Sequence, residues 1–235
     1  MQISLFRLSN YCLIVFLFLQ TEISQAQNKV LVEKFSNVGC APCMVYKPKF
    51  DSIVKASSDK ITLLEYRTSW PSPKDPFYNL NVNDNRERVV YYEVTGIPMI
   101  QVNGKMYFTN EFTGELIDSL FKQKNQVTVT ADFSLHTDTV TVQVKLNTQT
   151  ELAGTYRLYA TDVGGEYDNI LRQNLVADGS ELKLPDLKKD FEGNYIFNGV
   201  FINSKYFNAA KTKVICFLQN IETKEVVASC YASLK

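Results

Sequence analysis

The spacing of apolar residues changes once along the chain, near residues 124–126. This change indicates two units of different fold class. Before it, short apolar runs alternate with segments of helical spacing, such as residues 42–57. After it, apolar and polar residues alternate one by one, as in residues 127–135. We therefore expect an α/β unit over residues 27–125 and an all-β unit over residues 126–235.

The first unit has the predicted order strand, helix, strand, helix, strand, strand, helix. The strands are expected at 30–35, 61–66, 99–102 and 106–108, and the helices at 42–57, 84–92 and 112–121. Asn103-Gly104, between the last two strands, is typical of a primed hairpin turn. A proline-rich loop, residues 70–81, follows the second strand. This order predicts helices layered on a sheet.

The second unit shows short segments of period two, separated by turn residues. Strands are expected at 127–135, 139–146, 155–161, 170–176, 181–184, 195–202, 214–219 and 226–231. Short strands at this spacing are typical of an antiparallel sandwich of the immunoglobulin-like kind.

The first 26 residues have the pattern of a secretory signal peptide. Arg7 precedes an apolar run at 11–19, and the small residues Ser24 and Ala26 suit a cleavage site. The run is too short to span a bilayer, which needs about 20 residues. We expect residues 1–26 to be removed and the protein to be exported, to the periplasm or in association with the outer membrane. The alternative is an uncleaved anchor.

Cysteine, histidine and charge counts limit the chemistry. Of five cysteines, removal of residues 1–26 takes away Cys12, and the others then lie in a compartment where disulfides persist. The one histidine, His136, argues against a histidine-based triad and a multi-histidine metal site. Lys+Arg and Asp+Glu are both 25, so nucleic acid is not an expected partner. We expect neither a metal nor an organic cofactor.

Cys40-Ala-Pro-Cys43 lies where the first strand ends and the first helix begins. Unpaired N–H groups and the helix dipole favour negative charge at that position. A Cys40 thiolate would be stabilised there, which makes Cys40 the candidate nucleophile. Cys43, one turn later, is the candidate resolving cysteine. Two other interpretations stay open: an inert disulfide, and a zinc site completed by Cys216 and Cys230.

Residues 29–124 resemble the thioredoxin fold. The resemblance rests on the two cysteines at the helix start, on Pro48 inside the helix, and on Gly96-Ile97-Pro98 before a strand. It implies that Ile97–Pro98 is a cis peptide, which proline permits. It also implies that Pro98 faces the disulfide and shapes the surface that binds substrate.

Two positions depart from the thioredoxin pattern. Thioredoxins carry tryptophan before the first cysteine, where this chain has Gly39. They also carry a buried acid six positions before it, where this chain has Lys34 with Glu33 beside it. Proton transfer to and from Cys43 therefore lacks its usual partner. We expect Lys34 to modulate the thiol pKa by stabilising a thiolate.

The other two cysteines flank a predicted hairpin loop at 221–225. If the hairpin is centred on Thr223, Cys216 and Cys230 are directly opposite, at a separation that a disulfide can span. We expect a structural disulfide between them. The alternative is two buried free thiols that act as small apolar residues.

The whole mature chain resembles Bacteroidetes outer-membrane-associated proteins that join an N-terminal thioredoxin-like domain to a C-terminal β domain. The segments that carry the resemblance are residues 32–40, 75–104 and 214–226. Two functions follow. The first is an envelope thiol–disulfide oxidoreductase, whose partners would be protein thiols and disulfides and an electron donor or acceptor. The second is a binding or adhesion protein that uses the thioredoxin-like fold as a scaffold without redox turnover.

Overall fold

The computed structural model describes residues 28–123, 126–136, 139–148, 154–163, 169–174, 188–202 and 213–234. The expected signal peptide and the expected strand at 181–184 lie outside the described residues. Residues 28–123 form one sheet and its helices, and each expected element between residues 30 and 121 is present within two residues of its predicted ends. The elements are β1 (Val30–Ser36), α2 (Ala41–Ala56), β2 (Ile61–Arg67), η1 (Tyr78–Leu80), α3 (Val82–Tyr91), β3 (Met99–Val102), β4 (Lys105–Tyr107) and α4 (Gly114–Phe121).

The sheet of the first unit has the strand order β2-β1-β3-β4. β1 and β2 are parallel and joined through α2, whereas β3 is antiparallel to both β1 and β4. A parallel βαβ half followed by an antiparallel hairpin and a helix is the thioredoxin-like arrangement that the sequence predicts. Asn103 and Gly104 both have positive φ, 47° and 84°, as a primed turn requires.

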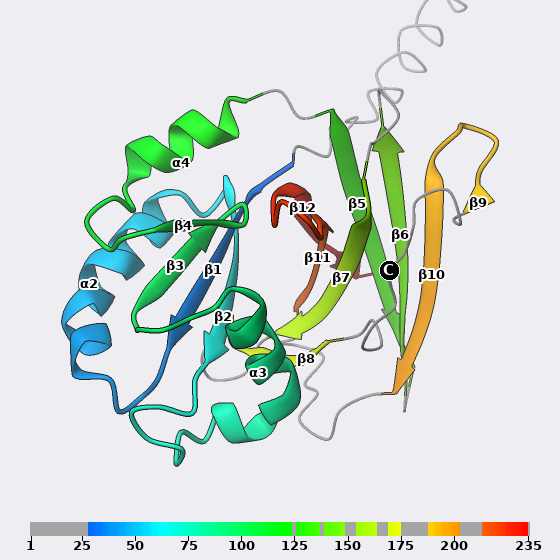
Figure 1. The fold of residues 1–235 in the computed structure, drawn as a ribbon. Coiled ribbons are helices and arrows are strands. Elements are labelled where there is room, and N and C mark those ends of the chain that lie inside the picture. The colour runs from blue at the N-terminus through cyan, green and yellow to red at the C-terminus, as the bar shows by residue number, and fades with distance from the viewer. Residues whose placement is uncertain are drawn as a thin grey trace, which may run out of the picture.

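Successive side chains along each strand point to opposite faces of the sheet, and the two faces pack against different partners. One face is covered by α2 and α4, and its apolar core contains Val30 and Val32 of β1 with Phe50 of α2. Figure 1 shows these two helices on the side of the sheet away from the second half of the chain. Lys34 and Ser36 have the same parity as Val30 and Val32, so they face α2 as well.

The second unit consists of two sheets packed face to face. One has the order β13-β5-β6-β10-β9 and the other β12-β11-β7-β8, and side chains from both build one apolar core. The described pairings between its strands are antiparallel, as the sequence predicts, except that of β13 with β5, which is parallel. The strands are β5 (Val127–Leu135), β6 (Thr139–Thr148), β7 (Tyr156–Val163), β8 (Leu171–Asn174), β9 (Lys188–Lys189), β10 (Tyr195–Ile202), β11 (Lys213–Asn220), β12 (Val226–Tyr231) and β13 (Ser233–Leu234).

The two units share a third apolar core, which lies on the face of the first sheet opposite α2. Phe35 and Tyr66 of that sheet pack in one cluster with Tyr159 and Phe217 of the second unit. The rings of Tyr159 and Phe217 are stacked, with centroids 4.5 Å apart. In Figure 1, β11 and β12 lie beside β1 and β2, where this core forms. The second unit thus supplies one of the layers that cover the thioredoxin-like sheet.

A buried polar network crosses this shared core. Arg88 of α3 binds Glu33 of β1 (Nη2–Oε1, 2.5 Å) and donates to Gln219 of β11 (Nη1–Oε1, 2.9 Å). Tyr92 donates from its hydroxyl to Glu33 at 2.6 Å and accepts from Gln219 Nε2 at 2.8 Å. All four residues are buried. A charge in such a site requires a partner, so this network ties the two units together.

The outer edge of β2 is capped by three different elements. The N–H of Leu63 donates to the Tyr231 hydroxyl at 3.0 Å, and the N–H of Glu65 donates to the Asn169 carbonyl at 2.8 Å. The N–H of Arg67 donates to Oδ1 of Asn85 at 2.6 Å. These bonds cover an edge that would otherwise be open to pairing with another chain.

Cys216 and Cys230 are directly opposite on β11 and β12, which confirms the predicted register. They are nevertheless free thiols, so the structure does not contain the disulfide that the sequence led us to expect. Cys216 belongs to the core of the second unit, and Cys230 packs against it. Burial raises the pKa of Cys230 to about 12 and that of Cys216 well above its usual value. Both act as small apolar core residues, the alternative considered above.

Candidate functional site

The site is the disulfide between Cys40 and Cys43, at the junction of β1 and α2. Cys40 is the N-cap of α2, and the backbone N–H of Cys43 donates to its Sγ at 3.1 Å. No acidic residue occupies the first turn of the helix, and Pro42 stands at its start. The sulfur that the sequence singles out as a nucleophile therefore occupies the position where a helix stabilises negative charge.

Little of either cysteine reaches the surface: Cys40 is 3% exposed and Cys43 5%. A reacting sulfur from another molecule must therefore approach through the residues that surround the disulfide. Those surroundings include Ile97, whose carbonyl oxygen lies 3.8 Å from Cys40 Sγ. The Ile97–Pro98 peptide bond is cis, as the thioredoxin resemblance implies.

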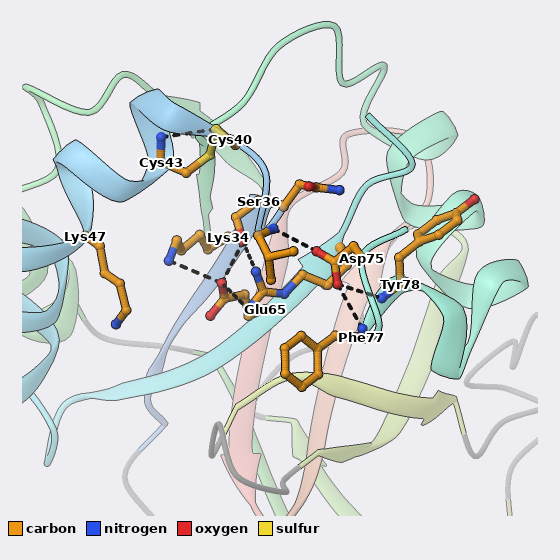
Figure 2. A network of polar contacts seen from close by, with 12 residues as sticks. Lys34, Ser36, Cys40, Cys43, Lys47, Glu65, Asp75, Phe77 and Tyr78 are labelled. Atoms are coloured by element: carbon orange, nitrogen blue, oxygen red, sulfur yellow. Dashed lines mark hydrogen bonds and ion pairs between the residues drawn. A yellow bond between two sulfur atoms is a disulfide. The ribbon is translucent and has the colours of Figure 1, made fainter. Parts of the chain in front are cut away.

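The proline-rich loop is fastened to the segment that precedes Cys40. Asp75 is buried and accepts hydrogen bonds from the N–H groups of Val38 (2.8 Å) and Phe77 (2.8 Å). Asn37 donates to the carbonyls of Thr68 and Ser72, at 2.7 and 2.9 Å. Figure 2 shows Asp75 accepting hydrogen bonds from the backbone N–H groups of Phe77 and Tyr78 within this loop. These hydrogen bonds hold the loop against the segment that leads into Cys40, so the loop forms one side of the site.

A cluster of four polar side chains lies beneath the first turn of α2. Lys34 and Ser36 of β1 pair in register with Glu65 and Arg67 of β2, and all four alternate onto the face that α2 covers. Oε1 of Glu65 lies 3.2 Å from both Lys34 Nζ and Arg67 Nη2, and it accepts from Ser36 Oγ at 2.6 Å. Figure 2 shows Lys34 and Glu65 below the turn that carries Cys40 and Cys43.

Lys34 is held against the inner face of α2. Its Nζ lies 4.6 Å from the centroid of the Phe50 ring. Phe50 and Cys43 are the two buried residues of that helix, seven positions apart and therefore on one face. The ammonium group is thus enclosed between the helix face that bears Cys43 and the carboxylate of Glu65.

Charge balance within the cluster keeps Glu65 ionised. Burial by itself would raise the pKa of this carboxyl, but the charges of Lys34 and Arg67 and the Ser36 hydroxyl outweigh it and lower the pKa. Arg67 in turn lies over the Phe77 ring, with its guanidinium carbon 5.3 Å from the centroid. The cluster therefore reaches from the underside of α2 to the proline-rich loop.

Glu65 is the residue that sequence reasoning missed. The chain has lysine where thioredoxins carry their buried acid, and the carboxylate comes instead from the neighbouring strand. The available signal was a pair of charges, Glu65 and Arg67, at alternate positions of a strand that is otherwise mostly apolar. The structure places the Ile97–Pro98 segment beside Cys40 and Lys34 against the inner face of α2, whereas Cys216 and Cys230 belong to the core of the other unit.

The described part of the chain shows neither a metal-binding cluster nor a membrane-spanning helix. It contains no group of three or more His, Cys, Asp or Glu side chains arranged to hold a metal ion. The same residues include no helix long and apolar enough to cross a membrane.

Comparison with solved structures supports the fold. HBP35 of Porphyromonas gingivalis superposes with a TM-score of 0.71 at 13% identity, over 88% of this chain and 76% of that one. Protein AGR_C_4864 from Agrobacterium tumefaciens gives 0.55 at 15% identity, over 89% of this chain and 96% of that one. No family model and no curated protein matches the chain. At these identities the likeness shows a shared fold and nothing about activity.

Proposed function

We propose that the protein is an exported thiol–disulfide oxidoreductase that acts on protein disulfides of the cell envelope. The observation that carries the proposal is the placement of Cys40 as the N-cap of α2, with the Cys43 N–H directed at its sulfur. Export is supported by the pattern of residues 1–26 and by the resemblance of the mature chain to outer-membrane-associated proteins. The periplasm and the outer-membrane surface are its proposed locations.

In the proposed reaction the reduced protein transfers two electrons to a substrate disulfide. The Cys40 thiolate attacks one substrate sulfur, a Cys40–substrate disulfide forms, and the other substrate sulfur leaves and takes up a proton. Cys43 then loses its proton and attacks Cys40. The Cys40–Cys43 disulfide forms and the second substrate thiol is released. A thiol reductant from outside the chain restores the dithiol, and no organic cofactor takes part.

The remaining site residues have supporting roles in this proposal. Lys34, held against the helix face of Cys43, stabilises the thiolate that attacks the mixed disulfide. Pro98 follows Ile97, whose carbonyl oxygen lies 3.8 Å from Cys40 Sγ, and in this proposal it shapes the surface on which the substrate backbone lies. Glu65 keeps the lysine in place through its carboxylate.

A second candidate is a binding or adhesion protein that carries the disulfide without turnover. The low exposure of Cys40 and Cys43 favours it, because exchange requires direct approach to a sulfur atom. In this case the second unit, an immunoglobulin-like sandwich in our proposal, supplies the binding surface.

Reduction of insulin by dithiothreitol in the presence of the purified protein separates the two candidates. The oxidoreductase proposal predicts catalytic turnover that Cys40→Ser abolishes. It also predicts that reduced Cys43→Ser, mixed with insulin after the dithiothreitol has been removed, accumulates a covalent mixed disulfide that mass spectrometry detects. Equal rates for the wild type and Cys40→Ser would overturn it and favour the binding protein.

A further inference from the structure

A cavity of about 760 Å³ lies between the two units, at the end of β1 away from the disulfide. The turn Asn103-Gly104 lines it, and Oδ1 of Asn103 accepts from the N–H of Leu31 at the start of β1. Cys40, by contrast, follows the end of this strand. The hairpin that joins β11 and β12 supplies another wall. A cavity of this size between two units is typical of a site that binds a small molecule.

The floor of the cavity is apolar and comes from both units. Val102 of β3, Val127 of β5 and Val226 of β12 line it and are buried. The N–H of Val226 donates to the carbonyl of Asn103 at 3.0 Å, so a backbone hydrogen bond joins the two units at this point. Figure 1 shows β12 between the first sheet and β5, and it contacts strands of both units. The nonpolar part of a ligand therefore gains contact area on a surface that the fold holds in place.

Five polar side chains line the same cavity, and their polar atoms are not engaged by the protein itself. They are Lys105 and Tyr107 of β4, Gln123 after α4, Tyr156 of β7 and Glu225 before β12. Among the described residues, none of these side chains has a hydrogen-bond or ion-pair partner. Hydrogen-bonding groups from both units therefore face one space and are available to a ligand.

Tyr156 is the most informative of the five. It packs in the core of the second unit and is 7% exposed, yet its hydroxyl makes no hydrogen bond within the described part of the chain. This oxygen is not among the fully covered polar atoms that lack a partner, so it remains accessible. Because buried polar groups are nearly always hydrogen-bonded, the Tyr156 hydroxyl requires a partner from the cavity, either water or a ligand.

Lys105 and Glu225 bring opposite charges to the rim of the cavity from different units, and both are exposed. The ammonium group of Lys105 lies 5.5 Å from the centroid of the Tyr107 ring. The backbone N–H of Glu225 donates to the Thr223 hydroxyl at 3.3 Å. The described lining residues therefore carry no net charge, and the cavity does not favour an anion or a cation over a neutral ligand.

We propose that this cavity binds a short, uncharged oligosaccharide. A sugar ring has an apolar C–H face and a rim of hydroxyl groups, each of which both donates and accepts. The carboxylate of Glu225 accepts, the ammonium of Lys105 donates, and the tyrosine hydroxyls and the Gln123 amide do both. A sugar matches this mixture and the apolar floor together. A zwitterion would engage the two charges and leave the hydroxyls and the amide without partners. The cavity lies apart from Cys40, so binding there is independent of the proposed redox function.

Isothermal titration calorimetry of the purified protein tests the proposal with maltose, cellobiose and N,N′-diacetylchitobiose. At least one of these disaccharides should show saturable binding. Tyr156→Phe should weaken that binding about fivefold through loss of a neutral hydrogen bond, and Glu225→Gln about tenfold through loss of a charged one. Tyr156→Phe keeps the aromatic ring in the core, and Glu225 is exposed, so both variants should fold as the wild type does.

The matched controls are Tyr195→Phe, which packs against the same core outside the cavity lining, and Glu222→Gln, in the same hairpin loop. Both should bind the disaccharide as the wild type does, and so should Cys40→Ser, which separates this site from the reaction at the disulfide. Absence of saturable binding by all three sugars would overturn the inference, as would equal affinity in the wild type, Tyr156→Phe and Glu225→Gln. Saturable binding of glycylglycine without any sugar would also overturn it, because the cavity would then select a zwitterion. Insulin reduction tests the proposed function separately from all these outcomes.

Discussion

The amino group of Lys34 and the carboxylate of Glu65 lie 3.2 Å apart on neighbouring parallel strands, beneath the turn of α2 that bears the disulfide. In the thioredoxin pattern the acid stands at the position of Lys34, whereas here it stands on the neighbouring strand. Buried ion pairs contribute little net stability, but loss of one partner leaves a costly uncompensated charge. The pair therefore makes the site sensitive to substitution at either position.

Lys34→Met should destabilise the protein by about 3 kcal/mol at neutral pH, because Glu65 would keep only Arg67 and Ser36 as partners. Urea denaturation measures the loss. The control is Lys60→Met, which breaks the more exposed pair with Asp118 and should have a much smaller effect. Equal losses of unfolding free energy in the two variants would contradict the expectation that breaking the buried Lys34–Glu65 pair costs more than breaking an exposed pair.

The pH dependence of stability should depend on Glu65. Its pKa is lowered in the folded state, so its contribution is fully present above the unfolded pKa, about 4.3, and is lost as the pH falls through the folded value. The unfolding free energies of the wild type and Glu65→Gln should therefore differ by a constant amount from about pH 7 to pH 5 and converge in more acidic solution. A difference that grows on acidification would contradict the assigned ion pair.

Much of this fold could be predicted because its signals are local. The helix start at Cys40, the primed turn at Asn103-Gly104 and the opposed positions of Cys216 and Cys230 each depend on a few consecutive residues. Which strands neighbour one another depends on tertiary packing, so the sequence showed neither Glu65 beside Lys34 nor Gln219 beside Arg88. Two cysteines that face each other in a hairpin can be bonded or not, so the predicted register did not decide whether Cys216 and Cys230 form a disulfide. In the structure both are free thiols.

The two units should unfold in one transition, because they share an apolar core and the Arg88 network. Trp70, the single tryptophan, reports on the first unit by fluorescence, while far-ultraviolet circular dichroism reports on all strands. The two urea curves should coincide, and Arg88→Met should shift both midpoints equally by leaving Glu33 buried without its cation. Two separated transitions would contradict a shared core.

Gly104 should tolerate no side chain. Its φ is +84°, and a Cβ there would lie 1.7 Å from the backbone carbonyl oxygen of Lys224 in the second unit. Gly104→Ala should therefore cost at least about 2 kcal/mol, through left-handed strain and overpacking. Gly114→Ala is the control, since its Cβ meets nothing within 4 Å, and it should stabilise the protein by about 0.5 kcal/mol. Thermal unfolding of both variants checks the contrast.

The most direct test of the account is the pKa of the Cys40 thiol in the reduced protein. Thiolate absorbance in the ultraviolet, recorded against pH for the wild type and for Cys40→Ser, isolates this group. Cys216 and Cys230 do not interfere, because burial raises their pKa values. The helix N-terminus and the Cys43 N–H predict a pKa well below the ordinary value of about 8.5. A pKa at or above that value would contradict the assignment of Cys40 as a nucleophile.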